Sequence, residues 1–430
     1  MATLLFGTFF IFLFIGLPIA FSILLGALFG TFMNELPLMV VAQRMLIASD
    51  NFSMLAIPLF ILAGDLMNVG GITSRMVNFA YSIVGHIRGG LGMTAISASM
   101  IFAGISGSAV ADTSAVGSLL VPAMIKKKYH PGFAASLQAA GGTLGPIIPP
   151  SILMVLYGSI TNVSIGGLFL SGIIPGVLIG LLCMFVTWVL ASPKLQPEIE
   201  REPWQGVGAI MGTLKPALPA LMMPIIIIAG IISGIFTATE ASAVAVLYAF
   251  FVGMVVHREL KFSHLPKILI DSAATTCMIM LIIAAAACFG WLLAWAEFPT
   301  IIGDWLKSVT DNKYVFILLL LGFLTILGMV VEVIAIATIF GPLLALLGEQ
   351  YGFDPVHYGL VILIVIQMGG ITPPVGIILQ ITCGLAHIGF GPSIKYLVWY
   401  LLAMFAIVAL VIIFPGLATF LPDTFLGTGT

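Results

Sequence analysis

One apolar region of the chain, between Gly104 and Ser114, is dense in oxygen-bearing side chains. These side chains are Ser106, Ser108, Asp112, Thr113 and Ser114. Hard cations take hydroxyl, carboxylate and carbonyl oxygens as ligands, and glycine lets a carbonyl turn out of helical pairing. The alternative is that small residues allow close helix packing while the hydroxyls bond across helices. Asp112 favours an ion or substrate site, because a carboxylate at membrane depth usually has a functional partner.

A second region, from Gly328 to Thr338, resembles the first but is less polar. Glu332 and Thr338 are its only polar side chains. Three roles stay open for Glu332: an ion ligand, a residue that orients a hairpin, and a buried hydrogen-bonded acid.

Each region is followed by a stretch through which no helix can run. The first stretch is Gly141–Pro150 and the second is Gly369–Pro374. Proline removes a backbone donor and clashes with the preceding turn, and glycine adds conformational freedom. An ordinary proline kink explains one such break but not two matched ones. In a membrane, a matched pair of breaks points to the binding site of a transporter.

A broken helix exposes both kinds of helix end. The half-helix that begins after Pro150 or Pro374 presents N–H groups, which suit a carboxylate. The half-helix that ends at Gly141 or Gly369 presents carbonyls, which suit a cation. The side-chain candidates beside these ends are Thr143, Ser151 and Thr372. We therefore expect a cation and a carboxylate close together at mid-membrane.

Other acids in apolar stretches favour structural roles. Glu240 is expected to cap a helix that starts near residue 238. Asp65 and Asp304 each follow a glycine near the end of a span, which is typical of interface or capping residues. The chain has no Walker loop, HExxH or GxSxG motif, so nothing indicates an enzyme. Uphill transport would then depend on an ion gradient or on a partner.

The composition indicates lipid as the solvent. Of 430 residues, 61% are hydrophobic and 7% are charged, whereas soluble domains carry roughly 25% charged residues. The net charge of −2 suggests no partner, and nothing indicates nucleic-acid binding. The chain is apolar from its start, without the features of a cleavable signal, and the first span is expected to run to Phe32. We expect a multi-pass protein of the bacterial inner membrane.

The interrupted apolar segments predict two kinds of unusual element. We expect re-entrant hairpins at about residues 94–125 and 328–348, and broken helices at about 133–158 and 358–384. Glycine, proline and histidine landmarks of the first set recur in the second at offsets of 224 to 228 residues. An internal repeat follows from this correspondence.

The chain therefore divides into residues 1–191 and 216–430, joined by a polar linker and amphipathic arm at 192–215. Lys and Arg are absent before Arg44 and after Lys395, and Lys126–Lys128 and the linker are basic. By the positive-inside rule both ends lie outside and the middle lies in the cytoplasm. Each half of the chain then crosses the membrane an odd number of times, which predicts an inverted repeat. The expected fold class is an all-α polytopic membrane protein of two inverted repeats, with an elevator-type ion-transporter-like fold.

At four motifs the chain resembles the large membrane subunit of tripartite ATP-independent periplasmic (TRAP) transporters. These motifs are Gly104–Asp112, Gly145–Ser151, Gly234–Ala241 and Gly370–Gly376. The resemblance implies an elevator-type secondary transporter driven by Na⁺, with two or more coupling ions and no organic cofactor. It also implies a periplasmic binding protein that delivers a carboxylate, and a small four-span membrane subunit. This chain starts directly at the large subunit, so the small one is expected to be a separate protein.

The resemblance also assigns residues. One ion site would use Ser106, Ser108, Asp112, Gly142 and Thr143. A second would use Gly328, Glu332, Gly370 and Thr372. The substrate would contact Thr113, Pro149, Pro150, Ser151, Thr338 and Pro374. The first break is four residues longer than the second, so we expect two similar but unequal ion sites with the substrate between them.

The predicted function is sodium-coupled import of an organic acid, such as sialic acid or a C4-dicarboxylate. The alternative is a stand-alone ion-coupled organic-anion carrier that needs no binding protein. A membrane-embedded enzyme or a channel is a third class, which substrate turnover or uncoupled flux would indicate.

Overall fold

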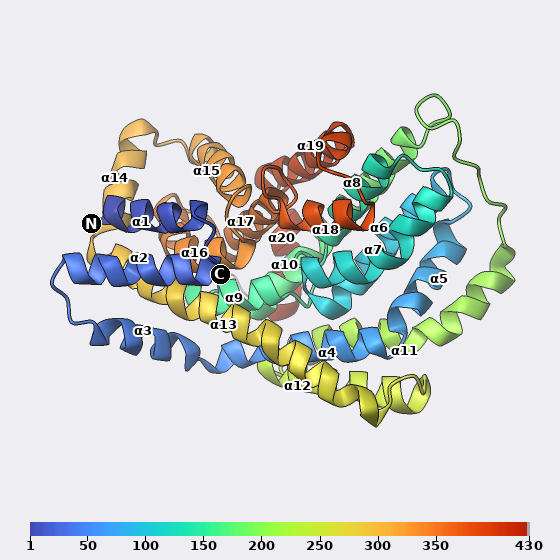
Figure 1. The fold of residues 1–430 in the computed structure, drawn as a ribbon, viewed down its shortest axis with the longest axis horizontal. Coiled ribbons are helices and arrows are strands. Elements are labelled where there is room, and N and C mark those ends of the chain that lie inside the picture. Colours follow the sequence, from blue (N-terminus) through green and yellow to red (C-terminus); the bar gives the residue numbers. More distant parts are fainter. Residues whose placement is uncertain (428–430) are drawn as a thin grey trace.

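The computed structural model describes residues 1–427, and this part of the chain folds into helices joined by short connections (Figure 1). Within it, eight helical segments are long and apolar enough to cross a membrane. No strand occurs among the described residues. The predicted all-α polytopic membrane protein is confirmed.

The N-terminal helices form one side of the molecule together with α13 (Figure 1). They are α1 (Ala2–Phe14), α2 (Ile19–Met33), α3 (Met39–Ser49) and α4 (Ala56–Val69), and α13 covers Leu265–Trp295. The prediction of a single first span to Phe32 is wrong. Gly16 takes a φ of 94° and Pro18 follows it, so the chain turns and α2 packs back on α1.

We call the helices between residues 72 and 190 the first unit. Its helices are α5 (Ile72–Val84), α6 (Gly90–Ser106), α7 (Ala109–Lys126), α8 (Pro131–Gly142), α9 (Ile152–Thr161) and α10 (Ile165–Leu190). Helices α6 and α7 form a hairpin whose turn is Gly107, at a φ of 61°, and Ser108. Helices α8 and α9 are the two halves of the broken helix, separated by residues 143–151.

The second unit has a similar order of helices, with one more helix at its end. Its helices are α14 (Phe298–Val309), α15 (Lys313–Gly328), α16 (Val333–Gln350), α17 (Pro355–Gly369), α18 (Ile377–Leu385), α19 (Gly391–Ile413) and α20 (Gly416–Leu426). The predicted hairpin at 328–348 is wrong, because residues 333–350 form one helix. The arms are α15 and α16, and the tip is residues 329–332. At ~1.5 Å per residue, the 16 residues of α15 reach about 24 Å, less than the ~30 Å of a bilayer core.

The two units interlock at their breaks. Helix α9, which follows the first break, packs on α16 and α17 of the second unit. Helix α18, which follows the second break, packs on α7 and α8 of the first. Both hairpin tips and both breaks are therefore brought to one place in the molecule.

The middle of the chain differs from the predicted linker and arm at 192–215. Helix α11 (Gly206–Ile232) already begins at Gly206, so only residues 191–205 connect α10 to it. This connection contacts both units. The Gln196 side chain donates to the Tyr396 hydroxyl at 3.1 Å and accepts from the His130 N–H at 3.3 Å. Lys127 and Glu202 form an exposed ion pair at 2.7 Å.

Helix α12 (Ala238–Phe251) begins with the cap predicted for Glu240. The Glu240 carboxylate accepts from the Thr237 N–H at 2.8 Å, and the Thr237 hydroxyl accepts from the Glu240 N–H at 3.3 Å. This reciprocal pair is a capping box. The structural role predicted for Glu240 is confirmed.

Candidate functional site

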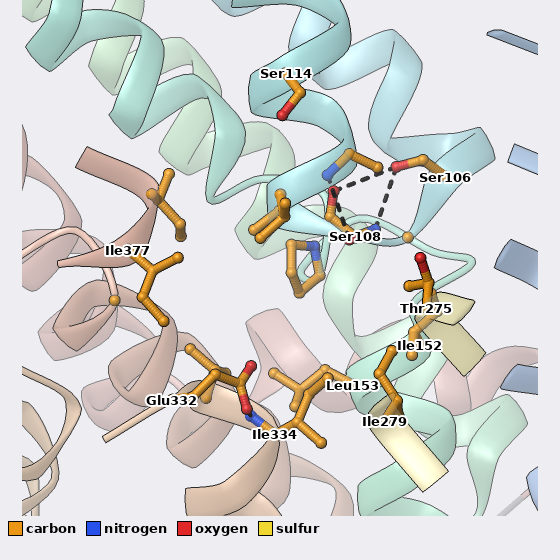
Figure 2. Close-up of a pocket in the computed structure, with 18 of the residues that line it drawn as sticks. Ser106, Ser108, Ser114, Ile152, Leu153, Thr275, Ile279, Glu332, Ile334 and Ile377 are labelled. Atoms are coloured by element: carbon orange, nitrogen blue, oxygen red, sulfur yellow. Dashed lines mark hydrogen bonds between the residues drawn. The ribbon is translucent and has the colours of Figure 1, made fainter. Parts of the chain in front are cut away.

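A cavity of about 690 Å³ lies where the hairpin tips and the breaks meet, bordered by α4 and α13 (Figure 2). Its polar side chains are Asp65, Asn68, Ser106, Ser108, Ser114, Ser118, Thr275, Glu332 and Gln367. No Lys, Arg or His is among the residues that line it. Ser106 and Ser108 lie on one side and Glu332 on the other (Figure 2). The cavity therefore carries carboxylates without a side-chain cation.

Hydrogen bonds within the first hairpin tip position its hydroxyls. The Ser106 hydroxyl donates to Asp112 Oδ1 and accepts from the Ser108 N–H, the latter at 3.2 Å. Ser108 in turn caps α7, because its Oγ accepts from the Ala111 N–H at 3.4 Å. Ser106 and Ser108 face the cavity, whereas Asp112 lies behind them, fully buried in the first turn of α7.

Two buried oxygens behind this tip have no hydrogen-bond partner. They are Asp112 Oδ2 and Thr113 Oγ1. The backbone of the first break passes against both. A Cβ added to Gly145 would lie 2.5 Å from Asp112 Oδ2, and one added to Gly142 would collide with the Thr113 hydroxyl. Buried polar atoms are normally paired, so orphaned oxygens beside a broken helix form a donor set that suits a bare cation.

The second unit contributes Gly328 at the end of α15, Glu332 in the hairpin tip and Gly370 at the second break to the cavity. Glu332 Oε2 accepts from the N–H groups of Ile334 and Ala335, at 2.9 and 3.1 Å, and so caps α16. These hydrogen bonds agree with two of the three roles left open for Glu332, a residue that orients the hairpin and a hydrogen-bonded acid. Its carboxylate also faces the cavity (Figure 2).

Ten of the predicted site residues lie outside the lining of the cavity. They are Asp112, Thr113, Gly142, Thr143, Pro149, Pro150, Ser151, Thr338, Thr372 and Pro374. Several of their hydroxyls are engaged locally. Thr143 donates to the Ala140 carbonyl at 2.7 Å, Ser151 to that of Pro146 at 2.6 Å, and Thr338 to that of Ile334 at 2.7 Å. The Thr372 hydroxyl donates to the Met368 carbonyl at 2.8 Å and extends the end of α17.

The structure places other polar side chains in the cavity wall that sequence reasoning did not select. Asp65, expected at an interface or cap, lines the cavity and accepts from the Ser272 hydroxyl at 2.5 Å. Asn68 and Thr275 line the same wall. The spacing of three between Asp65 and Asn68, and between Ser272 and Thr275, puts each pair on one face of an apolar helix. That spacing is a signal that could have identified them.

Four helix N-termini converge on the cavity, those of α7, α9, α16 and α18. Each brings the positive end of a helix dipole, which attracts an anion. Side chains cap three of them: Ser108 on α7, Ser151 on α9 and Glu332 on α16. Helix α18 follows Gly376 and has no side-chain cap. The arrangement can therefore hold an anion at helix ends and cations at oxygen clusters.

The chain is similar over nearly its whole length to membrane transport proteins. The family described as "Tripartite ATP-independent periplasmic transporter, DctM component" matches residues 6–417. The sialic acid TRAP transporter large permease protein SiaM of Vibrio cholerae is 39% identical, over 97% of each chain. The 2,3-diketo-L-gulonate TRAP transporter large permease protein YiaN of Escherichia coli is 38% identical, over 94% of each. The C4-dicarboxylate TRAP transporter large permease protein DctM of Pseudomonas aeruginosa is 36% identical, over 89% of each.

A solved structure shares the fold at low sequence identity. The crystal structure of the YdaH transporter of Alcanivorax borkumensis, described as having an unusual topology, aligns with a TM-score of 0.59. The alignment covers 87% of this chain and 88% of that one at 14% identity. At this identity the likeness concerns the fold alone, and it agrees with the helical membrane architecture described above.

Proposed function

The chain belongs to the DctM family, the large permease proteins of tripartite ATP-independent periplasmic (TRAP) transporters, and we propose that it imports an organic acid together with Na⁺. As a member, it is a transport subunit with several spans in the bacterial inner membrane, and it is not an enzyme. The proposal concerns the coupling ion, the substrate, the mechanism and the partners.

The proposal rests on one observation: a cluster of oxygens that suits a cation lies beside helix ends that suit an anion. Buried Asp112 Oδ2 and Thr113 Oγ1 lack partners beside the first break, and this is the environment that a dehydrated Na⁺ fits. Four helix N-termini face the adjoining cavity and favour an anion. A cation bound behind the first tip would also offset the charge of a carboxylate in a cavity that lacks Lys and Arg. Each ligand would then strengthen binding of the other, which is the basis of symport.

The substrate class rests on the relatives and on the size of the cavity. The relatives carry sialic acid, 2,3-diketo-L-gulonate and C4-dicarboxylate in their names, and all three are organic acids. A cavity of about 690 Å³ lies within the range of roughly 300–1,000 Å³ that is usual for small-molecule sites. We propose that a small carboxylate of this kind is the cargo.

The interlocked units favour an elevator mechanism. The contacts of α9 with α16 and of α18 with α7 and α8 make the hairpins and broken helices one packed body. In the proposal this body moves against a scaffold that includes α4 and α13. These two helices line the cavity but are not part of the moving body. The tripartite character of the family supports two partners, a periplasmic binding protein and a small membrane subunit.

Reconstitution tests this function directly. We expect vesicles that contain the chain and the small subunit to accumulate a radiolabelled organic acid only with an inward Na⁺ gradient and the binding protein. K⁺ in place of Na⁺, or an ionophore that dissipates the Na⁺ gradient, should abolish accumulation. Uptake by vesicles that contain this chain alone would instead support the stand-alone carrier. Flux that ignores the Na⁺ gradient would contradict the coupling.

A further inference from the structure

Gln367 is a buried residue that lines the cavity and has a side-chain N–H group without a hydrogen-bond partner. It lies on α17, two residues before the helix ends at Gly369, and only 1% of it is accessible to solvent. It nevertheless lines the cavity, and its Nε2 has no hydrogen-bond partner. A buried polar group without a partner is unfavourable, so each such group in a folded protein calls for an explanation.

Several other polar side chains in the cavity wall form hydrogen bonds within the protein. Asp65 accepts from Ser272, Ser106 donates to Asp112, and Asn68 accepts from Thr73. Thr275 donates to the Asp271 carbonyl. Among the described lining residues, Gln367 is the buried one whose side-chain N–H group is left without an acceptor. An acceptor carried by a molecule in the cavity would satisfy this group.

The start of α18 lies beside Gln367. The Ile378 N–H donates to the Gly370 carbonyl at 3.2 Å, which holds the first turn of α18 against the end of α17. Gly370 is three residues after Gln367, and the first turn of α18 also lines the cavity through Ile377 (Figure 2). Of the four helix N-termini at the cavity, only that of α18 has no side-chain cap. An anionic group seated there would satisfy both the helix end and the amide.

We propose that Gln367 is a specificity-determining residue for the cargo. Its amide N–H donates to a carboxylate oxygen of the substrate, while the positive end of α18 attracts the same group. Recognition by a neutral donor and a helix end explains how a cavity without Lys or Arg selects an acid over its amide or alcohol analogue. The inference rests on the proposed function, since it takes the cargo to be a carboxylate.

The experiment compares four proteins in the full reconstituted system. They are wild type, Gln367→Glu, Gln367→Met and the control Gln380→Glu, which adds the same charge at an exposed position of α18 outside the cavity lining. The probes are radiolabelled sialic acid and succinate. We expect Gln367→Glu to raise KM for the transported acid about tenfold or more, because the donor is lost and a like charge added. Gln367→Met should raise KM less, and Gln380→Glu should match wild type.

Other outcomes would overturn the inference in distinguishable ways. If Gln367→Met weakens the Na⁺ dependence and Gln367→Glu restores it, the residue is a cation ligand through its carbonyl oxygen. If all Gln367 variants lose thermal stability while KM and Na⁺ dependence stay unchanged, its role is structural. If wild type transports neither probe although its binding protein binds one of them, the proposed function fails first and the inference fails with it.

Discussion

Asp112→Asn is expected to raise the Na⁺ concentration for half-maximal uptake about 10- to 100-fold. The substitution keeps the size of the side chain and an acceptor for the Ser106 hydroxyl, but removes the negative charge from a fully buried position. Hydrogen bonds to charged groups contribute about 1.5–3 kcal/mol each, which sets the scale for a lost carboxylate contact, and 1.4 kcal/mol corresponds to about tenfold in affinity. The weaker Na⁺ binding should shift the curve of uptake rate against Na⁺ concentration to higher concentrations. KM for the acid at saturating Na⁺ should change much less.

The control for this prediction is Asp304→Asn, which removes the same charge from an exposed position on α14. Uptake by that variant should respond to Na⁺ as wild type does. Thermal unfolding with and without Na⁺ gives a second reading, because a ligand that binds only the folded state raises its stability. Wild type should gain stability from Na⁺ and Asp112→Asn should not. An unchanged Na⁺ response in both measurements would remove Asp112 from the ion site.

Gly369→Ala is expected to reduce uptake about tenfold or more. Helices α15 and α17 meet at two glycines, and a Cβ on Gly369 would lie 2.6 Å from the Cα of Gly328 and 2.9 Å from its carbonyl carbon. Backbone atoms cannot yield as a flexible side chain can, so the helices must separate. Overpacking of this kind costs about 1–3 kcal/mol. The displaced helices carry Gly328 and Gly370, both of which line the cavity.

A matched control lies on α15, the helix that Gly369 of α17 contacts. Gly322→Ala places its Cβ where no atom lies within 4 Å. It should leave uptake intact and stabilise the helix slightly, since alanine is favoured over glycine in a helix by roughly 1 kcal/mol. Parallel measurements of thermal stability and initial uptake rate separate the two variants. Equal uptake by Gly369→Ala and Gly322→Ala would show that the contact of α15 with α17 does not govern transport.

The sequence predicted the features that depend on local chemistry. A content of 7% charged residues required lipid as the solvent, and the eight candidate spans agree. Proline and glycine made the breaks at 143–151 and 370–376 predictable, because neither residue type supports a continuous helix. The first hairpin was predictable for the same reason, since Gly107 forms its turn. The Glu240 cap followed from the spacing of Thr237 and Glu240.

The features that were missed depend on how distant segments meet. The second hairpin has no glycine or proline in its tip at residues 329–332, so local signals placed the hairpin at 328–348 and left α15 out of it. Gln367 was not selected, because it is a lone polar residue in an apolar stretch of its helix. Asp65 was given an interface or capping role, because it follows a glycine near the end of a span. Such a pattern does not tell whether the polar group faces a cavity, a partner or lipid.

Composition and helix breaks by themselves therefore determined that this protein has several membrane spans and where its helices are interrupted. Only the tertiary structure decided which oxygens and amides share one cavity. That outcome requires α9 to pack on the second unit and α18 on the first. Contacts between residues more than 150 positions apart arise from the complementary shapes of packed helices, and no local residue pattern encodes them.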